Sequence, residues 1–158
     1  MTPPPPGRTA FAAALALLTG RALTSGELAA RLERRGYAAE EIAAATARVA
    51  ELGLLDDRRT AAAWAESAVR TRGLGPRRLR EGLARRLLDR DLVEEVVAGV
   101  FGPGEEAERA QAALGRWERA KGPADDEGRR RAAYAHLRRR GFSGAAARAA
   151  LFNRAEFE

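Results

Sequence analysis

The stretch LAARLERRGYAAEEI, residues 28–42, predicts the architecture of the whole chain because its pattern returns twice. Leu28 and Leu32 stand one helical turn apart, and Gly36-Tyr37 and Ile42 follow them. Side chains at i and i+4 lie on one helix face, and glycine supplies the left-handed residue at which many helices end. The stretch therefore predicts a helix, a tight turn that carries an aromatic side chain, and the start of a second helix.

The same offsets recur in LREGLARRLLDRDLV, residues 79–93, and in AYAHLRRRGFSGAAA, residues 133–147. A unit of about 50 residues buries too little apolar surface to be stable alone, so neighbouring units are expected to stack. We predict an all-α fold, an elongated array of three tandem three-helix repeats. The expected parts are a flexible proline-rich leader over 1–7 and repeats over 8–55, 56–103 and 104–158.

Apolar residues recur at helical spacing along the chain, and no segment alternates as a strand would. Helix starts are marked by the capping box Thr24 with Glu27, by Pro76, and by Asp91 with Glu94. Glycines and Gly-Pro pairs mark the breaks. We expect about nine helices, near 9–19, 25–35, 39–52, 57–72, 76–88, 92–101, 105–120, 126–140 and 144–153.

The chain is basic, with a net charge of +6 over 158 residues, and 27 of its 28 basic residues are arginine. A positive field attracts nucleic acid and acidic protein surfaces alike. No cysteine is present, which excludes disulfides and thiolate chemistry. The apolar run Ala10–Leu18 is too short to span a bilayer, and four prolines precede it, which is unlike a signal peptide. We expect a cytoplasmic, monomeric protein that does not bind membranes.

Motifs for catalysis are weak. His136 is the only histidine, and no carboxylate stands at i±3 or i±4 from it. Gly73-Leu74-Gly75 lacks the preceding strand and the Gly-Lys-Ser/Thr of a phosphate loop. Five acidic pairs stand at predicted helix starts, where carboxylates complement the helix dipole: Glu40-Glu41, Asp56-Asp57, Glu94-Glu95, Glu105-Glu106 and Asp125-Asp126. We expect no enzyme activity, no metal and no cofactor.

Aromatic side chains offer a second way to hold nucleic acid, by stacking on bases. The residues concerned are Trp64, Trp117, Tyr37, Tyr134 and Phe142. Each stands at a helical position suited to the core, so packing is the favoured interpretation.

Positive charge concentrates in two segments. Residues 70–90 contain eight arginines against two acids, and residues 129–154 contain eight arginines and no acid. On a helical wheel Arg77, Arg78 and Arg85 fall opposite the leucine stripe that begins at Leu79, so they should face solvent. A solvated helix face would look similar, but clustering in two of three repeats favours a binding surface. The candidate partner- or DNA-binding residues are Arg70, Arg72, Arg77, Arg78, Arg85, Arg138, Arg139 and Arg140.

From about Ala13 to Leu151 the chain resembles the RecX family of regulatory proteins, which modulate the RecA recombinase. The resemblance is carried by ALTSGELAARLERRGY (22–37), by VAELGLLDDRRTAAAWAESAVRTRGLGPRRLREGL (49–83) and by Arg139-Arg140-Gly141-Phe142. Two positions depart from the family pattern: Thr60 replaces a usual aromatic residue, and Leu87 replaces a usual glycine.

The resemblance implies an all-helical repeat protein that binds in the groove of the RecA filament on DNA. There it would inhibit recombination, the RecA ATPase and cleavage of the SOS repressor, without a catalytic centre of its own. Single- or double-stranded DNA is a second expected contact. Two other interpretations stay open: a helix-turn-helix-like transcriptional regulator that reads DNA with Arg138 to Arg140, and a structural helical scaffold.

Overall fold

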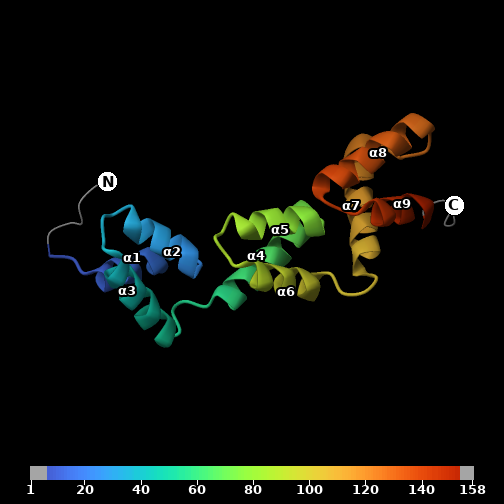
Figure 1. Cartoon of the computed structure of the whole chain (residues 1–158). Coiled ribbons are helices and arrows are strands. Elements are labelled where there is room, and N and C mark those ends of the chain that lie inside the picture. Colours follow the sequence, from blue (N-terminus) through green and yellow to red (C-terminus); the bar gives the residue numbers. More distant parts are fainter. Residues whose placement is uncertain (1–6, 154–158) are drawn as a thin grey trace. The chain divides into compact units, whose positions relative to one another are not determined.

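A computed structural model describes residues 7–153, and this part of the chain contains nine helices and no strand. Figure 1 traces them in chain order: α1 (Ala10–Gly20), α2 (Ser25–Glu33), α3 (Ala39–Glu51), α4 (Asp57–Arg72), α5 (Pro76–Ala84), α6 (Arg90–Val100), α7 (Glu105–Lys121), α8 (Glu127–Arg140) and α9 (Gly144–Asn153). The predicted all-α fold is confirmed. Within these residues no helix is both long enough and apolar enough to cross a membrane.

The predicted helix boundaries differ most from the observed ones around residues 85–91. The helix expected over 76–88 ends at Ala84, because Leu87 is left-handed with a φ of 59°. It occupies the turn position at which Gly36 and Gly141 have φ values of 81° and 97°. The predicted cap at Asp91 is wrong: α6 begins at Arg90, and the backbone N–H of Leu92 donates to Asp89 Oδ1 at 3.0 Å.

The chain divides into two compact units. Among the described residues, unit 1 comprises 7–63 together with Leu83–Val93, and unit 2 comprises Trp64–Gly82 together with 94–153. Helices α4, α5 and α6 each contribute to both units. The three repeat boundaries remain a prediction, and residues 1–6 of the expected leader lie outside the described residues.

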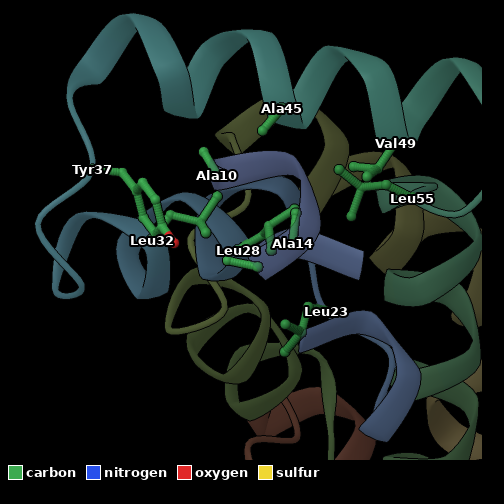
Figure 2. Packing of buried hydrophobic residues seen from close by; sticks show 10 residues of the cluster. Ala10, Ala14, Leu23, Leu28, Leu32, Tyr37, Ala45, Val49 and Leu55 are labelled. Atoms are coloured by element: carbon green, nitrogen blue, oxygen red, sulfur yellow. The ribbon is translucent and has the colours of Figure 1, made fainter. Parts of the chain in front are cut away.

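The core of unit 1 is formed where α1, α2 and α3 pack together. Leu28 and Leu32, the two leucines of the repeat pattern, have no exposed surface, and Val49 of α3 is equally buried. In Figure 2 the side chains of Ala14, Leu28 and Leu32 lie beneath α3, whose Ala45 and Val49 point toward them. Tyr37 also packs into this core, and its hydroxyl donates to the carbonyl of Arg8 at 3.0 Å. The turn therefore returns an aromatic side chain to the core, as the sequence pattern predicts.

A polar network in unit 1 is built around Thr24. This residue has no exposed surface; its hydroxyl accepts from the N–H of Glu27 at 3.1 Å and donates to the carbonyl of Arg86 at 2.6 Å. The Glu27 carboxylate completes the predicted capping box and pairs with the Arg86 guanidinium at 3.0 Å. Beside it, Ser25 donates to Asp57 from both its N–H and its hydroxyl. The network thus joins the start of α2 to residues far along the chain.

In unit 2, α7 packs against α8 and α9. Ala133, Leu137 and Phe142 occupy the positions of Leu28, Leu32 and Tyr37 in the repeat pattern, and all three are buried. Trp117 of α7 packs against the edge of this core while part of its surface remains exposed. The structure therefore confirms the repeat in its core positions.

Candidate functional site: an arginine-rich surface in unit 2

Two tight turns of unit 2 pair through their backbones. The turn between α4 and α5 meets the turn between α8 and α9: the N–H of Gly75 donates to the carbonyl of Arg140 at 2.8 Å, and the N–H of Arg77 donates to the carbonyl of Gly141 at 3.1 Å. A Cβ added to Gly75 would lie 2.5 Å from Phe142 N, and one added to Gly141 would lie 2.5 Å from Arg78 N. Only glycine fits at these two positions.

Guanidinium groups strengthen this turn pair. Arg78 Nε donates to the carbonyl of Arg139 at 3.0 Å, and an Arg77 nitrogen donates to the carbonyl of Arg138 at 3.2 Å. In the opposite direction, Arg140 Nη1 donates to the carbonyl of Arg72 at 2.8 Å. These carbonyls lie at the C-terminal ends of α8 and α4, which carry partial negative charge. Three of the predicted binding arginines, Arg77, Arg78 and Arg140, therefore stabilise the fold by donating to backbone carbonyls.

Glu81 forms ion pairs with two of the same arginines, Arg77 and Arg78. Its carboxylate pairs with Arg77 at 2.7 Å and with Arg78 at 2.9 Å. The hydrogen bond from Arg78, together with the charges of both arginines, holds the pKa of Glu81 below its usual value. The carboxylate therefore stays ionised and offsets part of the positive charge of α5.

The other predicted arginines are placed differently. Arg70, Arg72, Arg138 and Arg139 lie in unit 2 near the turn pair, whereas Arg85 lies in unit 1 and is not brought to this surface. The guanidinium of Arg72 lies 5.2 Å from the centre of the Trp64 ring, and Arg138 Nη1 donates to the carbonyl of Phe142 at 2.8 Å. Arg77, Arg78 and Arg85 are exposed, as the helical wheel predicts.

Helix α7 completes a groove next to the turn pair, which we call the cationic groove, with a volume of about 510 Å³. Among the described residues its lining contains no Asp or Glu. It contains five basic side chains, those of Arg72, Arg116, Lys121, Arg139 and Arg140. Arg116 and Lys121 stand outside the two arginine-rich segments, so charge clustering in the sequence does not mark them as candidates. Gly73 has a φ of 61° and no Cβ, and the Arg116 guanidinium fills that space: an added Cβ would lie 2.6 Å from Arg116 Nη2.

Two aromatic rings lie in the same groove. Trp117 and His136 both line it, and their ring centres are 6.2 Å apart with the planes tilted by 39°. Burial lowers the pKa of His136 below its ordinary value, and the charges of Arg140 and Arg139 lower it further. Burial and the two guanidinium charges therefore both favour the neutral imidazole.

A second hollow shares Arg116 and Gly73 with the cationic groove and has a lining of mixed chemistry. Its lining combines apolar Val69, Val100 and Phe142 with Arg70, Arg109 and Arg116, and it includes the carboxylates of Glu66 and Glu105. One of these carboxylates pairs within the hollow, since Glu105 lies 3.5 Å from Arg109. This surface carries less net positive charge than the cationic groove.

Three of the five acidic pairs cap a helix start, as predicted, whereas Glu94 lies beyond the first turn of α6 and pairs with Arg80 at 2.9 Å. Glu41, Asp56 and Asp126 each accept a backbone N–H in the first turn of a helix, from Ala38, Arg59 and Arg129 respectively. Glu106 instead accepts the N–H of Ser143, ahead of α9, at 2.7 Å. Within residues 7–153 no group of three His, Asp or Glu side chains is placed to hold a metal ion.

Sequence comparison relates the chain to one family along most of its length. A family model described as RecX, first three-helix domain, matches residues 10–48, and one described as RecX, second three-helix domain, matches residues 56–97. A protein of Mycobacterium avium named Regulatory protein RecX is 36% identical over 148 residues, which cover 89% of this chain and 85% of that one. The protein of the same name from Deinococcus radiodurans is 36% identical over 134 residues, but this chain covers only 62% of it.

Solved structures show the same fold. The crystal structure of RecX from Lactobacillus salivarius superposes with a TM-score of 0.79 over 91% of this chain and 93% of that one, at 16% identity. A second crystal structure, of a regulatory protein RecX, superposes with a TM-score of 0.72 over 87% of this chain and 67% of that one. At such low identity the likeness concerns the fold alone.

Proposed function

The chain belongs to the RecX family of regulatory proteins, and on that premise we propose that it binds the RecA recombinase on DNA and restrains it. The observation that carries the proposal is the match of both three-helix domain models together with relatives about one third identical over most of the chain. The proposed effects are inhibition of recombination, of the RecA ATPase and of SOS repressor cleavage, in the cytoplasm and without catalysis by this chain.

The basic surface of unit 2 supports this proposal physically. Arginine binds carboxylate and phosphate equally well through its planar fork, so an arginine-rich face suits a complex that presents acidic protein and DNA together. Arg70 belongs to unit 2, and Arg85, on unit 1, adds an exposed cation outside this surface; neither side chain makes an ion pair within the described residues. They are therefore available to a partner at no cost to an internal contact.

The transcriptional-regulator alternative has less support. In a helix-turn-helix protein the N-terminal residues of the recognition helix contact base edges. Arg138 to Arg140 instead form the C-terminal end of α8, and two of them, Arg138 and Arg140, donate to backbone carbonyls of the protein itself. Those two guanidiniums are already engaged and are poorly placed to read bases.

The proposal is tested by following single-strand-dependent ATP hydrolysis by RecA as this protein is titrated. We expect the rate to fall at substoichiometric amounts, and an unchanged rate would contradict the proposal. The variant Arg70→Glu with Arg85→Glu should inhibit less while it retains the wild-type helix content. The variant Arg35→Glu with Arg119→Glu changes the same charge at two other exposed arginines and should inhibit like wild type.

A further inference from the structure

We infer that the cationic groove binds single-stranded DNA, with its phosphates on Arg72, Arg116, Lys121, Arg139 and Arg140 and a base against Trp117. The groove draws these residues from three helices and the turn after α4, so it is a site of the folded unit and not of one helix. The inference rests on the proposed function only for the choice of DNA over RNA.

The charge of the groove is not neutralised from within. The side chains of Arg116, Lys121 and Arg139 are exposed and make no ion pair or hydrogen bond with any residue that the structure describes. Arg140 donates to a carbonyl and Arg72 lies over an aromatic ring, so both keep their full charge. Five cations that line one groove without a carboxylate create a strong local field for a polyanion.

The aromatic rings favour nucleic acid over an acidic protein surface. A partly exposed tryptophan beside arginines is the arrangement with which proteins hold single strands, because every base presents a π-face and every nucleotide a phosphate. A duplex keeps its bases stacked inside, so it would leave Trp117 unused. An acidic protein surface would use the cations alone and would leave the Trp117 ring without a stacking partner.

Arg116 is the best-placed single cation. It lines both hollows, and its guanidinium rests over Gly73, where any side chain would collide with it. The absence of a side chain at Gly73 thus leaves the space that the guanidinium occupies. A larger residue at position 73 would displace it.

The test measures binding of a fluorescein-labelled oligo-dT of about 20 nucleotides to the protein alone, by anisotropy across a range of salt concentrations. The groove variant is Arg116→Ala, Lys121→Ala and Arg139→Ala together. The control variant, Arg35→Ala, Arg90→Ala and Arg119→Ala, removes the same charge from exposed arginines outside the groove. We expect the groove variant to bind at least about tenfold more weakly than the control variant, and its salt slope to be shallower by about two.

Several outcomes would overturn the inference. The first is that the wild type does not bind oligo-dT at low salt, and the second is that the groove and control variants bind it equally. The inference also fails if the wild type binds the matching duplex or oligo-rU more tightly than oligo-dT. Failure here leaves the proposed function standing if the protein still slows ATP hydrolysis by RecA. Conversely, oligo-dT binding without an effect on RecA would support the groove and contradict the proposed function.

A second readout uses the only histidine of the chain. Phosphates in the groove would offset the charges of Arg139 and Arg140, which lower the pKa of His136. We expect the His136 resonance, followed by NMR as a function of pH, to titrate at higher pH when oligo-dT is bound. An unchanged titration with the oligonucleotide bound would place the DNA elsewhere.

Discussion

Gly75 and Gly141 lie in direct backbone contact although 65 residues separate them in sequence: a Cβ added to Gly75 would lie 2.5 Å from the carbonyl carbon of Gly141. Two turns that belong to different repeats of the sequence pattern are therefore joined within unit 2. The arginines that flank them donate to the helix ends on either side. This contact brings Arg139 and Arg140 next to Arg72 and so forms one side of the cationic groove.

We expect Gly75→Ala and Gly141→Ala each to destabilise the protein by about 2 kcal/mol or more, because the new methyl group would separate the turns. Gly141→Ala should be the worse of the two, since its φ of 97° adds backbone strain. Urea unfolding followed by circular dichroism measures both. Gly99→Ala is the control: it adds a methyl group in open space on α6, so it should be neutral or stabilising by up to about 1 kcal/mol.

Leu87→Gly should stabilise the protein by about 1 kcal/mol. Leu87 has a φ of 59°, a conformation that costs a side-chain-bearing residue free energy, and its side chain is 56% exposed, so little packing is lost. The reciprocal change Gly36→Leu, at the matching turn of unit 1, should destabilise by a similar amount. A lower urea midpoint for Leu87→Gly would show that the turn is not strained.

Thr24→Val should cost about 2 kcal/mol of the free energy of unfolding. The hydroxyl both caps α2 and donates to the carbonyl of Arg86, and the valine would leave these two buried groups without partners. Thr9→Val is the matched change, because Thr9 caps α1 through the N–H of Ala12 at 3.2 Å but is exposed. It should cost about 1 kcal/mol or less. Equal losses would mean that the Arg86 contact contributes nothing.

Arg78→Ala should lower stability by about 1 kcal/mol, whereas Arg85→Ala should stay within about 0.5 kcal/mol of wild type. Arg78 donates to the carbonyl of Arg139 and pairs with Glu81. Arg85 is exposed, and no hydrogen bond or ion pair of its side chain is found among the described residues. Thermal unfolding of the two variants separates an arginine that holds the fold from one that is free to bind.

His136 should make the stability depend on pH. Because its pKa is lowered in the folded state, the unfolded chain takes up the proton more readily, and stability falls as the pH drops below about 6.5. Trp117 lies beside the ring, and among the described residues no carboxylate lines the groove to stabilise the protonated imidazole. His136→Gln should therefore lose less stability than wild type between about pH 7.5 and pH 5. If the stability of wild type and of His136→Gln falls in parallel with pH, protonation of His136 does not contribute to the pH dependence.

Local patterns account for the parts of the fold that the sequence predicted well. The capping box at Thr24 and Glu27, the turn glycines such as Gly36 and Gly141, and the leucines one turn apart act within about ten residues, so they are readable without a structure. The error at Asp91 arose because Asp89 satisfies the same chemistry two residues earlier, and only backbone geometry distinguishes them. The end of α5 was missed because a leucine there adopts a conformation that local preference assigns to glycine.

The sequence by itself determined the helices, their order, the buried leucine positions and a positive charge that calls for an anionic partner, since all of these follow from residue type and short-range spacing. Only the tertiary structure decided which arginines are engaged and which are available. Arg78 and Arg140 donate to helix ends brought close by the pairing of Gly75 with Gly141, while Arg116 and Lys121 join Arg139 from a separate helix. The reason is that a guanidinium is engaged when carbonyls or carboxylates lie close enough to accept its hydrogen bonds, and many of these acceptors belong to residues distant in the sequence.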